Sequence, residues 1–264
     1  LLLLVVFHFA ESWKVVKTGP PSADTKPLFN PVSASELADL KERCGKSSFI
    51  STIATRSRRA SDAKTASIND FPWAAYIQKR NTIFVKETND SVVTADMACG
   101  ATLISRRHLL TAANCIADTA NGTEKSQSEV IVKYGGDCML RTDTKECAKD
   151  NMLTARVRSI TFDDKQTNIF CGNDFAILEL ESDVEFSATV SPVCVPTAEE
   201  DVPFHAFEAG WGAIATNPKT FSSTLRYSIT ATKVMDSAFL SVNTSYDPAL
   251  KEQKSYGSLQ TTPE

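Results

Sequence analysis

The segment from Cys99 to Cys115 constrains the fold more than any other part of the sequence. It reads C-G-A-T-L-I-S-R-R-H-L-L-T-A-A-N-C, so two apolar, β-prone runs flank a polar Ser-Arg-Arg turn and a cysteine stands at each end. This pattern predicts a β-hairpin stapled by its cysteines.

The length and composition of the chain exclude several classes of protein. With 264 residues and 42% apolar side chains, the chain is long enough for one large all-β domain or two smaller ones with a packed core. A net charge of −4, with no basic run beyond residues 56–59, argues against a nucleic-acid partner. After residue 10 no apolar run is long enough to span a bilayer, so we expect no membrane segment in the mature protein.

The N-terminal segment and the cysteine count indicate a secreted, extracellular protein. We interpret the apolar residues 1–10 as the remnant of a signal peptide, with a membrane anchor as the alternative. Seven cysteines favour an oxidising compartment. Three Asn-x-Ser/Thr sequons are candidate glycosylation sites and fit a secreted chain: Asn89, Asn121 and Asn243.

Residues 11–59 are expected to form a leader with a short helix and a basic linker. Prolines at positions 20, 21, 27 and 31 interrupt both helix and sheet, which predicts an extended chain. Ser33 and Glu36 then make a capping-box pattern, which predicts a short helix toward Cys44. The Ser/Thr/Ala-rich residues 47–67 carry three arginines and predict an exposed linker that is easily cut.

Alternating apolar and polar residues predict that the main domain is all-β. Residues 154–162 are expected to form a strand with one solvent-exposed face, and residues 241–264 an unstructured polar tail. The other expected strands are residues 71–77, 82–86, 91–94, the two arms of the 99–115 hairpin, 130–135, 204–212 and 225–234.

Five motifs stand in a fixed order along the chain: Phe-Pro-Trp at 71–73, the hairpin at 99–115, C-G-N-D-F-A-I-L-E-L at 171–180, S-P-V-C-V-P at 191–196 and Gly-Trp-Gly at 210–212. Together they resemble the trypsin-like and chymotrypsin-like serine proteases. The resemblance implies a protease domain over residues 60–240, folded as a double β-barrel. The first barrel is expected to be nearly complete and the second to be truncated.

The resemblance implies a catalytic site of which this chain holds one part. Asn114 stands at the position of the family's catalytic histidine, and Asp174 matches the aspartate that orients it. An amide has no titrating nitrogen, so Asn114 cannot take a proton from a serine hydroxyl. The alternative interpretation of Asp174 is a carboxylate that accepts backbone N–H groups at the start of a strand.

No other residue is expected to restore the chemistry. The sequence contains no Gly-Asp-Ser-Gly-Gly motif, and the serines after Gly-Trp-Gly, at 222, 223, 228, 237 and 241, lack the flanking glycines of an oxyanion site. His8 lies in the signal segment, and His108 and His205 are predicted to be surface histidines. No histidine pair has the spacing of a metal site, so neither a metal nor a cofactor is expected.

The resemblance also implies two disulfides and a cleavage site. Cys99 pairs with Cys115, and Cys44 with Cys194, which would keep the leader attached after any cut. Of the remaining cysteines, pairing of Cys138 with Cys147 is the shortest closure, and it leaves Cys171 free or awaiting a partner. Arg59 and Ala60 occupy the family's activation junction, and an exposed basic linker is the equal alternative.

These observations predict a secreted trypsin-like serine protease homologue that is catalytically inactive and acts by binding a protein. The expected partner is an unidentified protein, or a polypeptide substrate if the chain is active. The alternative is a serine endopeptidase whose full-length form carries the serine. A purely structural glycoprotein is the third possibility.

Overall fold

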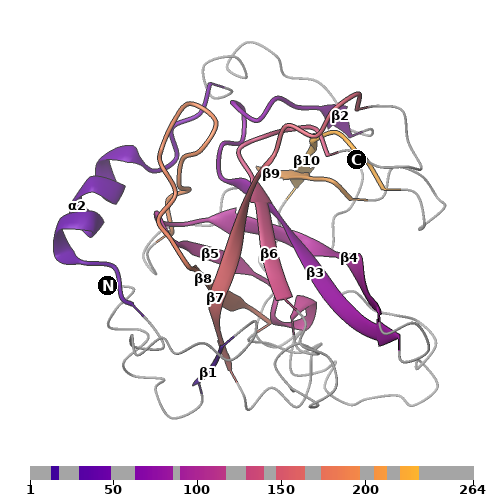
Figure 1. Cartoon of the computed structure of the whole chain (residues 1–264). Helices are drawn as coiled ribbons and strands as arrows, with labels where there is room; N and C mark the ends of the chain where they lie inside the picture. Colours follow the sequence, from indigo (N-terminus) through magenta and orange to yellow (C-terminus); the bar gives the residue numbers. More distant parts are fainter. Residues whose placement is uncertain are drawn as a thin grey trace, which may run out of the picture.

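The structure, a computed structural model of the chain, consists mainly of β-strands (Figure 1). It describes residues 13–17, 30–48, 63–85, 90–116, 129–139, 147–163, 174–196, 205–212 and 221–231. Within these ranges the strands are β1 (Trp13–Lys17), β2 (Lys64–Thr65), β3 (Ala74–Val85), β4 (Asp90–Leu103), β5 (His108–Thr111), β6 (Glu129–Tyr134), β7 (Leu153–Asp163), β8 (Ala176–Leu180), β9 (His205–Gly210) and β10 (Arg226–Ala231). The helices are α2 (Ala34–Arg43) and a 3-10 turn at Ala113–Cys115.

Six antiparallel strands close into a barrel. The hydrogen-bonded order is β6-β3-β4-β5-β8-β7, and β7 pairs back with β6 to complete the circle. Closure leaves no free edge between these strands, which protects the backbone N–H and C=O groups. The all-β class predicted from the sequence is confirmed.

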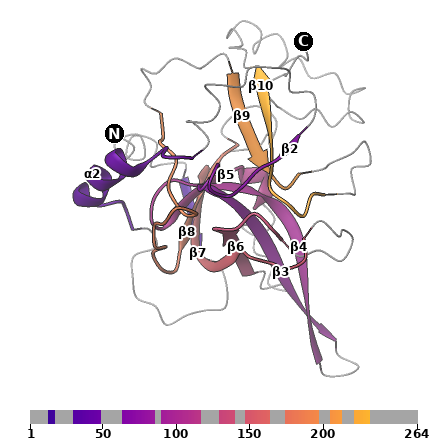
Figure 2. The same ribbon diagram turned by 90° about the horizontal axis from the view of Figure 1, so that it is seen from above.

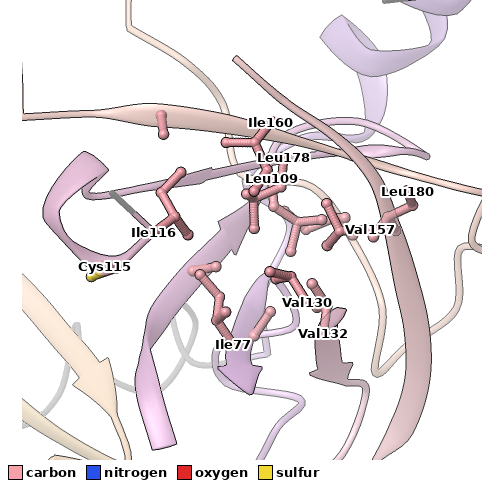
Figure 3. Packing of buried hydrophobic residues seen from close by; sticks show 14 of the residues in the cluster. Ile77, Leu109, Cys115, Ile116, Val130, Val132, Val157, Ile160, Leu178 and Leu180 are labelled. Atoms are coloured by element: carbon pink, nitrogen blue, oxygen red, sulfur yellow. The ribbon is translucent and has the colours of Figure 1, made fainter. Parts of the chain in front are cut away.

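The centre of the barrel is an apolar core to which every barrel strand contributes (Figure 3). Because strand side chains alternate between two faces, every second residue of β5 and β8 points inward. Leu109 and Leu178 are fully buried there, as are Ile77 of β3 and Val132 of β6. Each such side chain contributes about 1.5–3 kcal/mol, so this core is the main source of the domain's stability.

A smaller sheet lies beside the barrel, as Figure 2 shows. It has the order β2-β10-β9, and the strands expected at residues 204–212 and 225–234 are present as β9 and β10, which pair with each other. Trp211 of the Gly-Trp-Gly motif is buried and donates its indole N–H to the Asp137 carbonyl at 3.2 Å. Its ring meets that of Tyr76 at 6.3 Å, which joins the small sheet to the barrel wall.

Four predicted strands merge into two longer elements, β3 and β4. Residues 82–86 and 91–94 were expected to be separate strands, but the described parts of both belong to one long hairpin of β3 and β4. A register shift at Ile77–Gln78 lets these strands continue past the barrel wall. The expected wet face of residues 154–162 is present only in the first half of β7, because residues 159–162 are all buried.

The leader contains one element that the sequence did not predict and one that it did. Residues 13–17 form β1, which pairs with the end of β7, whereas the proline argument predicted only extended chain. That argument does not apply there, because the prolines begin at position 20. The predicted helix is α2, whose N-cap Ser33 accepts the Glu36 backbone N–H at 3.1 Å.

Candidate functional site

Asn114 is positioned by the hairpin of β4 and β5 at residues 99–115. Strand β5 ends at Thr111, whose hydroxyl donates to the Gly100 carbonyl at 2.9 Å, and the chain then makes the 3-10 turn at Ala113–Cys115. Ala113 and Cys115 are both buried, so Asn114 between them is turned to the exterior. The disulfide from Cys115 to Cys99 fixes this turn against β4.

Asp174 reaches Asn114 because β8 pairs with β5. Ala176 lies opposite Thr111 in that pair, which brings the residue two positions before β8 beside the 3-10 turn. The Asn114 backbone N–H donates to Asp174 Oδ1 at 2.8 Å, and Asn114 Nδ2 donates to Asp174 Oδ2 at 2.5 Å. The two interpretations of Asp174 are therefore both present, since one oxygen accepts a backbone N–H and the other the side-chain amide.

The amide oxygen of Asn114 does not create a base. It lies 3.4 Å from the Sγ of Cys115, which carries no proton because it is disulfide-bonded. Both contacts with Asp174 use Asn114 as the donor, and an amide nitrogen is not basic. The geometry therefore provides an oriented polar pair without a proton acceptor of the histidine type.

Two of the serines considered as nucleophiles are buried, and the hydroxyl of one of them is hydrogen-bonded to other groups. Ser222 and Ser223 are fully buried. The Ser222 hydroxyl donates to the Thr224 carbonyl at 2.7 Å and accepts Arg226 Nε at 3.0 Å. Ser228 lies within β10. Residues 237 and 241 lie outside the described ranges.

The prediction that His108 is a surface histidine is wrong. Its side chain is on the outer face of β5 but is only 3% exposed. The Ser105 hydroxyl lies 2.8 Å from His108 Nδ1 and accepts the backbone N–H groups of His108 and Arg107. With both lone pairs used, the hydroxyl donates to Nδ1, which favours the tautomer protonated at Nε2.

Burial lowers the pKa of His108 below its ordinary value, since a charged imidazole is poorly solvated there. The Glu179 carboxylate opposes this shift, the Arg107 guanidinium adds to it, and the Asn30 backbone carbonyl and Asp183 oppose it. His108 is thus held neutral in the outer layer of the barrel. His205 begins β9, and its side chain lies outside what the structure describes.

Sequence reasoning missed a buried carboxylate on the same outer face. Glu179 lies directly opposite His108 in the β5–β8 pair and is 1% exposed. Its oxygens accept Arg158 Nη1 at 3.0 Å and the Ser159 hydroxyl at 3.1 Å. The available signal was a single charged residue inside the apolar run A-I-L-E-L.

The structure forms three disulfides, and they are the pairs named in the sequence analysis: Cys44–Cys194, Cys99–Cys115 and Cys138–Cys147. Several sequence predictions fall outside the described residues. They are the signal segment 1–10, the tail 241–264, the junction Arg59–Ala60, the sequons at Asn89, Asn121 and Asn243, and the fate of Cys171.

Two kinds of feature are absent from the residues that the structure describes. In those ranges no group of three or more His, Cys, Asp or Glu side chains is arranged to hold a metal ion. Likewise, the described part of the chain has no helix with the length and apolar character needed to cross a membrane.

The closed six-stranded barrel is that of a trypsin-like serine protease fold. The family model described as Trypsin matches residues 61–252, so the chain belongs to the trypsin family. This confirms the family resemblance and the trypsin-like all-β fold. Proteins of this family act on polypeptide substrates or protein partners.

Similar proteins come from animals of several kinds. CLIP domain-containing serine protease B9 of Anopheles gambiae is 29% identical over 175 residues, which are 64% of this chain and 39% of that protein. Chymotrypsin-C of Rattus norvegicus is 28% identical over 177 residues, 66% of this chain and 56% of that protein. The proclotting enzyme of Tachypleus tridentatus is 28% identical over 170 residues, 62% and 41% respectively. The chain thus spans about half or less of the length of these relatives.

Proposed function

We propose that this chain is a secreted trypsin-like serine protease homologue that does not hydrolyse peptide bonds through this site and acts by binding protein. The observation that carries the proposal is the donation of two Asn114 N–H groups to Asp174. In an active site of this type the same aspartate orients a histidine, whose second nitrogen takes the serine proton.

Asn114 keeps the orienting contact and loses the proton-transfer step. Its amide nitrogen has no lone pair available for a proton near neutral pH, and its exposed position offers water in place of a base. In serine proteases the triad acts as a unit, and loss of the base lowers kcat by a factor on the order of 10⁶. Any residual hydrolysis would be too slow to serve as the protein's function.

Binding without cleavage is what remains of a protease surface when the base is lost. Proteins of this family recognise polypeptides, and recognition requires no proton transfer. We infer that this chain binds a protein that active relatives also bind, and that it competes with them. The three disulfides support secretion, because such bonds persist in oxidising compartments.

A fluorophosphonate probe tests the inactivity directly. The probe forms a covalent bond with a serine that a neighbouring base activates. We expect no labelling of the purified protein and no turnover of Arg/Lys-linked or aromatic ester substrates. Labelling of one serine on the intact chain, together with turnover, would establish the rival function, a serine endopeptidase.

The Asn114→His variant tests the role of Asp174. A carboxylate within hydrogen-bonding distance favours the charged imidazole, so we expect NMR titration to give the introduced histidine a raised pKa. Asn114→His combined with Asp174→Ala is the matched control, in which the shift should disappear. Equal pKa values in the two variants would show that Asp174 does not orient this position.

Protein binding is tested by affinity capture from the secreted fraction, followed by titration of the captured protein. We expect one partner that binds saturably and whose cleavage by an active trypsin-family protease slows when this chain is added in excess. A chain that captures nothing and does not slow cleavage would favour the structural-glycoprotein alternative.

A further inference from the structure

Residues 30–48, called here the leader segment, lie across the outer face of the barrel, with α2 on the outside (Figures 1 and 2). At its first residue the Asn30 backbone N–H donates to Glu179 Oε2 at 3.2 Å, and Asn30 Nδ2 donates to Glu179 Oε1 at 2.8 Å. One asparagine thus supplies a donor to each oxygen of a carboxylate 149 positions further along the chain.

The carboxylate lies in a polar strip on three neighbouring strands. His108, Glu179 and Ser159 face one another across β5, β8 and β7, on the side of the sheet opposite the apolar core. Alternation would leave this face in water, yet the three residues are 3%, 1% and 1% exposed. The Asn30 contacts show that the leader segment is part of what covers the strip.

Among the described residues, the barrel donates two of the four hydrogen bonds that the Glu179 carboxylate accepts. Arg158 Nη1 and the Ser159 hydroxyl contribute one hydrogen bond each, and Asn30 contributes the other two. A buried carboxylate that loses its donors is strongly unfavourable, because burial removes the water that would replace them. Glu179 therefore favours the state in which Asn30 is bound.

Further contacts hold the rest of the segment. Arg106 lies 3.4 Å from Asp39 of α2 and 4.3 Å above the Phe186 ring. Leu40 is buried, and the Gly45 N–H donates to the Pro192 carbonyl at 2.9 Å. These contacts are additional to the Cys44–Cys194 disulfide: Asp39 and Leu40 precede Cys44 in the chain, and Gly45 follows it.

We propose that the barrel surface formed by Arg106, Arg158, Ser159 and Glu179 is a binding site for the leader segment, with Glu179 recognising the Asn30 amide. The segment then remains bound when the chain is cut within residues 49–62 and when the Cys44–Cys194 disulfide is absent. The leader is accordingly a noncovalent subunit of the domain as well as a disulfide-tethered one.

The test uses the full chain with a recognition site for a sequence-specific protease placed within residues 51–58 and with Cys44→Ser and Cys194→Ser. After cleavage, gel filtration should return the leader fragment with the barrel at micromolar concentration. Adding Asn30→Asp places a carboxylate against Glu179 and should weaken retention by about tenfold to 100-fold. The control is Ala34→Asp, which adds the same negative charge at an exposed position in the first turn of α2 and should leave retention unchanged.

A rescue variant separates recognition from general damage. Asn30→Asp together with Glu179→Gln restores a donor–acceptor pair with the roles exchanged, so retention should recover relative to Asn30→Asp alone. Circular dichroism should give the same barrel signal for Asn30→Asp as for the chain with Asn30, since Asn30 lies outside the barrel. Separation of the fragment with Asn30 intact, or equal loss in the Asn30→Asp and Ala34→Asp variants, would overturn the proposal.

Discussion

The buried carboxylate of Glu179 gives the sharpest stability prediction, the effect of Glu179→Ala. The side chain is 2% exposed and accepts four hydrogen bonds, including one from an Arg158 side chain that is itself only 11% exposed. Removing the carboxylate leaves the guanidinium nearly buried without its counter-charge. The variant should therefore lose more stability than an average core truncation.

The size of the stability loss depends on which of the four donors can form hydrogen bonds with water once the carboxylate is removed. Hydrogen bonds to a charged group are worth about 1.5–3 kcal/mol each, so four would sum to roughly 6–12 kcal/mol if none were replaced. Asn30 is half-buried and can turn toward solvent, which recovers part of that sum, whereas Arg158 cannot. We therefore expect a loss of about 3–5 kcal/mol, the usual cost of breaking a buried pair from one side.

Urea unfolding followed by fluorescence measures this loss. The Tm in a thermal scan should fall by about 6–20 °C for a domain of this size. The matched control is Glu181→Ala, an exposed glutamate two residues further on, which should change stability by less than about 0.5 kcal/mol. Glu179→Ala combined with Arg158→Met should cost less than Glu179→Ala alone, because the unpaired guanidinium is gone. A loss no larger than that of the control would refute the reasoning.

Three further predictions concern single positions. Because burial lowers the pKa of His108, the unfolded chain binds more protons than the folded chain below about pH 6.5. The stability contributed by His108 is therefore complete above that pH and declines as the pH falls through the lowered folded-state pKa. In the His108→Gln variant the urea midpoint should depend less on pH between 7.5 and 5, and an unchanged slope would contradict this. Ser33→Ala removes the N-cap of α2 and should cost about 1 kcal/mol, seen as faster amide exchange in the helix and not in β3. Gly135→Ala forces a φ of +70° on a residue whose Cβ would lie 2.9 Å from Val190 Cγ2, which should cost about 1–3 kcal/mol in urea unfolding, whereas Gly210→Ala has no contact within 4 Å and should cost less.

The family resemblance implies that Asp174 lies near Asn114, and the strand register in the structure accounts for this proximity. Residues 99–115 define β4, its turn and β5, and the apolar run after Asp174 must pair with β5 to bury Leu178 beside Leu109. Once that register is set, Asp174 arrives beside the turn after β5. The atoms that meet could not be predicted, since they depend on the 3-10 geometry at Ala113–Cys115.

The outer face of the barrel could not be predicted from alternation. The alternation of side chains along a strand places His108, Ser159 and Glu179 on the face opposite the apolar core. A sequence pattern does not show what covers that face, so the alternation predicts that all three residues are exposed to solvent. Their burial depends on contacts with Asn30, more than 70 residues earlier in the chain. No local pattern carries that information, and the prolines around Asn30 indicated only an extended chain.

The contact between Asn114 and Asp174 explains how an amide occupies position 114 without weakening the fold. Asp174 is satisfied by two donors from Asn114, so the exchange of imidazole for amide leaves no unpaired carboxylate beside the turn. Glu179, by contrast, depends on a donor set that is completed only when the leader segment is in place. The fold therefore depends on Asn30 and Glu179 as a pair, whereas at position 114 it requires a side chain that donates to Asp174.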